Sequence, residues 1–190
     1  FIFMNRVLQI MMCLLVGTTT GTVLQAKNQS RKDLRQEVKR TQAVSDSLSY
    51  IQAFDALQQG RFVVEIDRLS FKRGKTASVS TNTNFISRDR SEAVVQVTFN
   101  GVRPGPSGIG GITLRGTVSD VHLEEGRKGI VYYSMRVLGG GIAAEIRITL
   151  TSGSNRVRVE VDPDFNSNDI TMDGRIVPYD DSSVYRGRVY

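Results

Sequence analysis

The sequence predicts a mainly β protein of the α+β class, in which one N-terminal amphipathic helix precedes a seven- to nine-stranded, mostly antiparallel sheet. Three observations support this prediction. Apolar residues recur at intervals of three and four before Gly60, they alternate with polar residues after it, and turn residues separate the alternating segments at hairpin spacing. Most strands have one apolar face, so we expect a barrel-like sheet or a sandwich.

The helix is predicted over residues 32–59. Ser30 and Asp33 resemble a helix N-terminal capping box, and Gly60 is well placed to end the helix. The apolar positions fall at helical spacing and are Val44, Leu48, Ile51, Phe54 and Leu57, with Ala43, Ala53 and Ala56 beside them. We therefore expect the second half of the helix to pack on the sheet.

The strands are predicted from period-two alternation after Gly60. They are centred on residues 62–71, 77–81, 85–86, 93–99, 112–123, 130–138, 142–150, 157–161 and 170–176. Residues 139–141 are three consecutive glycines and are expected to form a turn. Gly116 and Gly174 lie inside predicted strands, which indicates bulges or bends.

The N-terminal segment has the pattern of a secretory signal peptide. If Met4 is the start, Arg6 supplies the positive charge and residues 7–16 form an apolar run of ten residues, where a membrane-spanning helix needs about 20. We expect cleavage after Ala26, a polar, basic lead-in over residues 27–41, and a single β-rich domain with its helix over residues 42–190. The predicted location is periplasmic or secreted. Lipidation of Cys13 is not expected, because apolar residues continue past it.

Composition excludes several classes of site. The chain has 190 residues, a net charge of +6, one Cys and one His, so a disulfide framework, a multi-cysteine zinc site and a site built on several histidines are all excluded. Basic residues are interspersed with acidic ones, and no basic, aromatic-rich strand is present, so no nucleic-acid partner is expected. Contact between residues 27–40 and an anionic envelope surface remains open. No cofactor is expected.

Four segments resemble a family of exported bacterial proteins that is common in gut Bacteroidetes and is known as a domain of unknown function. They are residues 62–65 (FVVE), 82–86 (NTNFI), 105–113 (GPSGIGGIT) and 165–168 (FNSN). The resemblance covers about residues 50–187. It implies export, one β-rich domain and no assigned activity, and it assigns no functional residue.

Two loops contain residues that could bind a ligand. Gly108, Ile109, Gly110 and Gly111 belong to a glycine-rich loop that is long for a hairpin, and long loops often contact ligands. In the second loop, oxygen-bearing side chains occupy alternate positions, as in a calcium loop, and these residues are Asp162, Asp164, Asn166 and Asn168. Ser167 stands where such a loop needs Gly, so a turn that hydrogen-bonds its own backbone is the alternative.

No catalytic residue is assigned. A Ser–His–acid site around His122 is formally possible, but the chain has no Gly-x-Ser-x-Gly motif, and this histidine fits a structural or surface role. The sequence favours a non-enzymatic binding or scaffolding domain of the cell envelope. Two alternatives stay open: a carrier of an apolar or amphiphilic ligand in a pocket of the curved sheet, and a carboxylate-dependent envelope hydrolase. The partner is unknown, with an envelope component or an apolar ligand as the options.

Overall fold

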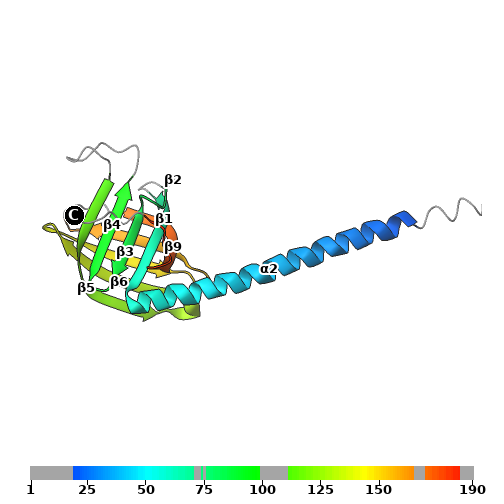
Figure 1. Cartoon of the computed structure of the whole chain (residues 1–190), viewed down its shortest axis with the longest axis horizontal. Helices are drawn as coiled ribbons and strands as arrows, with labels where there is room; N and C mark the ends of the chain where they lie inside the picture. Colours follow the sequence, from blue (N-terminus) through cyan, green and yellow to red (C-terminus); the bar gives the residue numbers. More distant parts are fainter. Residues whose placement is uncertain (1–18, 71–73, 75, 99–110, 165–169, 185–190) are drawn as a thin grey trace, which may run out of the picture. The chain divides into compact units, whose positions relative to one another are not determined.

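The computed structural model describes residues 19–70, 74, 76–98, 111–164 and 170–184. The chain divides into two units, Phe1–Val44 and Ser45–Tyr190. Helix α2 (Thr19–Gln59) contributes to both units (Figure 1). Among the described residues, no helix combines the length and the apolar character needed to cross a membrane.

Helix α2 begins well before the expected residue 32, because the sequence contains no Gly or Pro between Thr22 and Gln59 that would interrupt it. It ends where predicted. Gly60 adopts φ +64°, and its N–H donates to the carbonyl of Leu57 at 3.1 Å, which closes the last turn.

The β structure of the second unit is an eight-stranded antiparallel barrel, and it confirms the predicted mainly β class. The strands are β1 (Arg61–Ser70), β2 (Thr76–Ser78), β3 (Phe85–Asp89), β4 (Glu92–Thr98), β5 (Gly111–Glu125), β6 (Val131–Gly139), β7 (Ile142–Leu150), β8 (Arg156–Pro163) and β9 (Ile170–Pro178). Each strand from β3 to β9 pairs with the next, β1 pairs with β3, and β1 also pairs with β9, which closes the ring (Figure 1). The short strand β2 pairs with one end of β1.

The barrel interior is occupied by apolar side chains from all eight strands, which form one buried cluster. Phe62 of β1 and Tyr133 of β6 meet edge to face inside it, with ring centroids 5.5 Å apart. Ala53, Ala56 and Leu57 of α2 join the same cluster, so the end of the helix packs against the barrel. Burial of these apolar surfaces is the main source of stability in a chain whose single Cys cannot form an internal disulfide.

The expected helix packing is only partly right. Phe54 and Leu57 contact the core, but Val44, Leu48 and Ile51 are 61%, 57% and 52% exposed. A stripe of apolar residues indicates which face of a helix is apolar. It does not indicate how much of the helix packs against the rest of the protein.

Two glycines lie where neighbouring backbones approach closely. A Cβ on Gly116 would lie 2.2 Å from the carbonyl oxygen of Leu138, and one on Gly174 would lie 2.3 Å from that of Glu65. The register of β1 against β9 shifts beside Gly174, between Ile66 and Arg68. Both positions therefore require Gly. The predicted bulge is found beside Gly174, whereas the register shift on β5 lies beyond Gly116, between Ser119 and His122.

A second, smaller apolar cluster lies on the outer face of β1, β3 and β9. Val63 and Phe85 are buried there by Val184 of the C-terminal segment. Glu65 anchors that segment, because its carboxylate accepts hydrogen bonds from the Ser182 hydroxyl at 2.9 Å and from Arg175 at 3.1 Å. The segment thus covers apolar surface that would otherwise face solvent.

Candidate functional site

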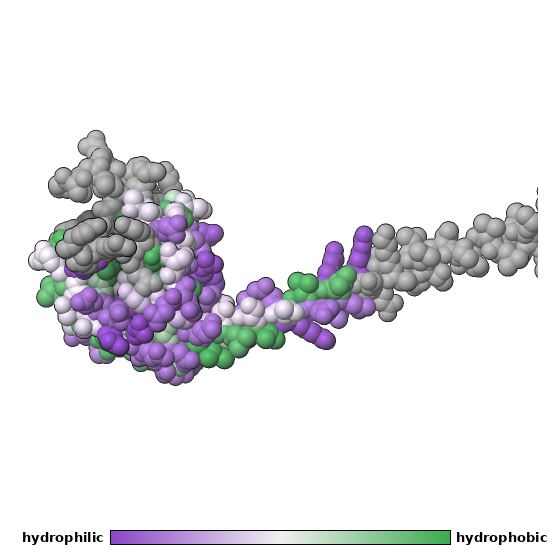
Figure 2. Space-filling model, in the orientation of Figure 1, coloured by the Kyte–Doolittle hydropathy of each residue, from purple (hydrophilic) through white to green (hydrophobic). Residues whose placement is uncertain are grey.

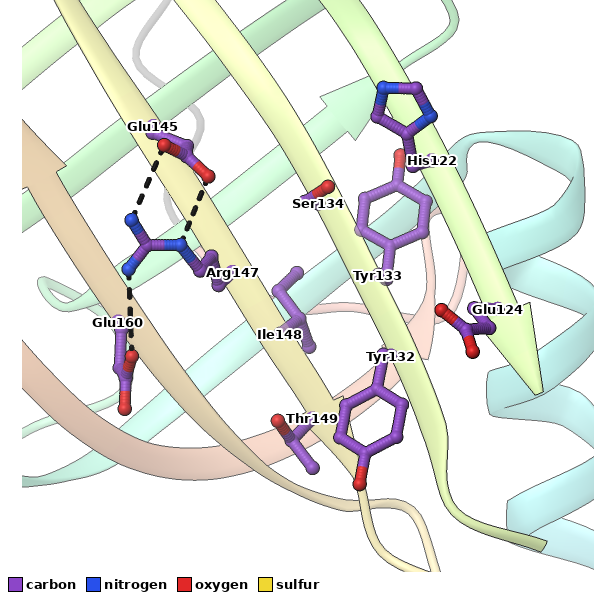
Figure 3. Close-up of a pocket in the computed structure, with 10 residues that line it drawn as sticks. All are labelled: His122, Glu124, Tyr132, Tyr133, Ser134, Glu145, Arg147, Ile148, Thr149 and Glu160. Carbon is purple, nitrogen blue, oxygen red and sulfur yellow. Dashed lines mark hydrogen bonds and ion pairs between the residues drawn. The ribbon is translucent and has the colours of Figure 1, made fainter. Parts of the chain in front are cut away.

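The outer face of β5, β6, β7 and β8 carries a hollow of about 290 Å³ (Figure 3). We call it the outer groove. It is lined by His122, Glu124, Tyr132, Tyr133, Ser134, Glu145, Arg147, Ile148, Thr149 and Glu160. Tyr133 and Ile148 point into the core, and the polar members alternate with them along the strands.

Strand register explains why the groove exists. His122 on β5 lies opposite Ser134 on β6, Ser134 lies opposite Arg147 on β7, and Arg147 lies opposite Glu160 on β8. Outward side chains in one such row are neighbours on the sheet surface. Ser134 is the shortest of the row, so a depression forms between the longer side chains around it.

Arg147 organises the charges at one side of the groove. Its Nε and Nη2 donate to the two carboxylate oxygens of Glu145 at 3.0 and 3.3 Å, and it lies 3.7 Å from both Glu160 and Asp162. The hydrogen bond to Glu145 raises the pKa of Arg147; partial burial opposes this, and the charges of the three carboxylates add to the increase. The guanidinium is therefore fixed in place as a permanent cation.

The balance of charge in the groove is negative, although the chain as a whole is basic. Glu124, Glu145 and Glu160 stand against one cation, Arg147. Tyr132 is 48% exposed and lies between Glu124 and Thr149 in the next row of outward side chains. An exposed aromatic ring bordered by carboxylates and hydroxyls can stack on an apolar face of a ligand while the surrounding groups hydrogen-bond its polar edges.

Glu145 and Glu160 do not form the pair of carboxyl groups that acid–base hydrolysis requires. A glycosidase places two carboxyl groups on either side of the scissile bond with open space between them. Glu145 and Glu160 instead flank Arg147 and are both paired with it, as Figure 3 shows. His122 and Ser134 face each other across β5 and β6, but within the described part of the chain no hydrogen bond joins them.

The glycine-rich loop lies mostly outside the described residues. Gly108, Ile109 and Gly110 fall there, and Gly111 is the first residue of β5, where it pairs with Thr98 of β4. A ligand contact by this loop remains a prediction.

The calcium loop is described only in part, because Asn166 and Asn168 fall outside the described residues. The two carboxylates at its start each lie close to an arginine. Asp164 pairs with Arg136, and Asp162 lies near Arg147. Within the described residues no three His, Cys, Asp or Glu side chains gather as a metal site. Calcium binding here also remains a prediction.

The sequence predicted a strand over residues 142–150, which contains Glu145 and Arg147, and it singled out His122, but it did not bring them together. The strand predicted over residues 112–123 stopped one residue short of Glu124, which is part of β5. The missing information is the register across four strands, which decides which outward side chains become neighbours. The available signal was the exposed aromatic residue, Tyr132, on an otherwise polar face.

Residues 45–176 match the family model described as Domain of unknown function (DUF4251). The chain belongs to the DUF4251 family. The match begins at Ser45, the first residue of the second unit, and covers the end of α2 and nearly all of the barrel.

A crystal structure of a DUF4251 family protein from Bacteroides eggerthii DSM 20697 is similar to this chain, with a TM-score of 0.69 and 41% sequence identity. The likeness covers 78% of this chain and 99% of the other. No curated protein matches this sequence. The resemblance noted from four sequence segments is thereby confirmed, and the family description assigns no activity to the DUF4251 domain.

Proposed function

We propose that this DUF4251 protein is an exported, non-enzymatic binding domain of the bacterial cell envelope, and that its outer groove holds a polar ligand. One observation carries the proposal. The barrel interior is filled by its own side chains, whereas the outer face offers an open hollow with an exposed tyrosine, hydroxyls and a fixed arginine.

The filled interior argues against the carrier alternative. A barrel that holds an apolar ligand keeps a lumen between its strands. Here Val64, Met135 and Ile146, from three different strands, are all 0% exposed within one cluster. A ligand of ordinary size would have to displace such side chains at a cost of several kcal/mol.

The arrangement of Arg147 argues against the hydrolase alternative. Because Glu145 and Glu160 are both paired with Arg147, they act as hydrogen-bond acceptors. Such acceptors can orient the hydroxyl or amine groups of a ligand. Export is supported by the leader pattern, with the positive Arg6, the apolar run over residues 7–16 and the small residue Ala26 before the basic lead-in.

The test is native mass spectrometry of the protein purified from its own cell envelope. We expect a co-purified polar species, such as a glycan or peptide fragment. Ser134→Trp would fill the floor of the groove and remove this species. The matched control is Thr117→Trp, which places the same ring at an exposed position of β5 outside the groove.

Two results would contradict the proposal. One is a co-purified lipid that survives Ser134→Trp, which would indicate a ligand inside the barrel. The other is equal loss of the species in both variants, which would show that the groove is not the binding site. Circular dichroism of each variant checks that the barrel is still folded.

A further inference from the structure

The positive charge of the chain is concentrated in one short helical segment. Residues 27–44 carry six Lys or Arg and two Asp or Glu, a net charge of +4, whereas residues 45–190 carry 18 and 17, a net charge of +1. The second unit is therefore almost neutral, and four of the six net charges lie in residues 27–44. Such an asymmetry is typical of proteins that bind an anionic surface.

Three of the six basic residues of this segment share a face of α2. Arg31, Arg35 and Lys39 are spaced by four, so they lie one above the other along the helix, and all three are exposed. We call them the basic ridge. Like charges at this spacing disfavour an isolated helix by a few tenths of a kcal/mol per pair. An anionic surface along the ridge would remove that repulsion.

Apolar side chains lie beside the ridge. Leu34 and Val38 are also spaced by four and are 58% and 68% exposed. Figure 2 shows hydrophobic and hydrophilic surface side by side along the described part of the helix. Basic residues attract a segment to an anionic membrane surface, and exposed aliphatic side chains beside them can enter its headgroup region. A nucleic acid would gain from the charges but not from Leu34 and Val38, so the pattern favours a membrane surface.

We propose that the first unit binds the surface of an anionic phospholipid bilayer through the basic ridge, with Leu34 and Val38 entering the headgroup region. Neither the outer groove nor the barrel takes part, so this proposal is independent of the proposed function. It assigns to the basic lead-in a role as a membrane-contacting tether for the DUF4251 domain.

The test is sedimentation of the full chain with vesicles of phosphatidylcholine alone and of phosphatidylcholine with about a third phosphatidylglycerol, a content that gives a negative surface potential. The apolar run near the N-terminus, with Arg6 beside it, is present in the unaltered chain and in both variants below, so it adds equally to the binding of each. We expect stronger binding to the anionic vesicles, and we expect added salt to weaken it, because exposed charges are screened within about 10 Å at 0.1 M.

The decisive variant carries Arg31→Gln, Arg35→Gln and Lys39→Gln, which keeps helix propensity nearly unchanged. Each basic residue near such a surface contributes about fivefold in partitioning, so the triple variant should bind anionic vesicles about 100-fold less tightly. The matched control removes the same charge from exposed barrel positions, with Arg68→Gln, Arg115→Gln and Arg127→Gln.

The control variant should bind like the unaltered chain. An equal loss in both triple variants would show that only net charge matters, and equal binding to the two vesicle types would show that lipid charge does not matter; either result overturns the proposal. Binding of a DNA duplex through the ridge, with no preference for anionic vesicles, would overturn it in favour of a nucleic-acid role.

Discussion

Ile146 provides the sharpest test of whether the barrel interior is a packed core or a lumen. It lies near the middle of β7, is 0% exposed and belongs to the interior cluster. Ile146→Ala removes three carbons from that cluster. At about 0.8 kcal/mol per buried carbon, the transfer term alone is about 2.4 kcal/mol.

The space left behind adds to this cost, because surrounding strands held in a closed ring relax only in part. Together the two terms predict a loss of about 3–4 kcal/mol, within the range of about 2–5 kcal/mol for such truncations. In a chain of this size the loss corresponds to a fall in Tm of about 10 °C. The assay is urea denaturation followed by circular dichroism, with thermal melting as a second readout.

Ile142→Ala is the matched control, since Ile142 is the first residue of the same strand and is 41% exposed. It should cost about 0.5 kcal/mol or less. A loss below about 1 kcal/mol for Ile146→Ala would refute the reasoning, because it would mean that this side chain borders open space rather than packed neighbours.

Three further predictions concern other parts of the barrel. Gly174→Ala should destabilise the protein by about 1–3 kcal/mol in chemical denaturation, because its Cβ would overlap the backbone of β1, whereas Gly140→Asn, at φ +59° with open space around it, should cost little. Glu65→Ala leaves the Ser182 hydroxyl without its carboxylate acceptor and should cost about 1–3 kcal/mol, with faster amide hydrogen exchange in the C-terminal segment; unchanged exchange there would contradict the anchoring role. Burial raises the pKa of Tyr133 above its ordinary value of 10.0, and the nearby Arg88 partly opposes this increase. The folded state therefore holds the phenol proton more tightly than the unfolded state does. The free energy of unfolding should fall as pH rises above about 10, and this pH dependence should be absent in Tyr133→Phe.

Local features were predictable because they depend on neighbouring residues. Gly60 ends the helix as expected. Of the three glycines expected to form a turn, Gly140 and Gly141 do so at positive φ, whereas Gly139 is the last residue of β6. Strand alternation was also sufficient to assign the inward residues. Val157, Val159 and Val161 of β8 are all buried, as their period-two spacing indicated.

Features that depend on distant parts of the chain could not be predicted in the same way. Barrel closure needs the pairing of β1 with β9, where Val63 lies opposite Val177, and no local pattern marks such a pair. The outer groove likewise depends on four strands that are in register. Ser134 is an ordinary polar residue of β6 until His122 and Arg147 are placed on either side of it.

The helix shows a third limit. Helical periodicity correctly gave a helix, but Leu48 and Ile51 are exposed although they continue the apolar stripe that buries Leu57. Helical periodicity shows that one face of the helix is apolar. Which residues of that face are buried depends on how far along the helix the barrel surface extends.

The central claim is that ligands reach this barrel from the outside. The most direct test is an NMR titration of the isotopically labelled protein with a soluble extract of its own cell envelope. We predict amide shift changes at Ser134, Arg147 and Tyr132, with none at the inward-facing Val64 and Ile86, which lie on strands outside the groove. Changes confined to Val64 and Ile86, with the outer positions unaffected, would contradict the account and indicate a ligand within the barrel.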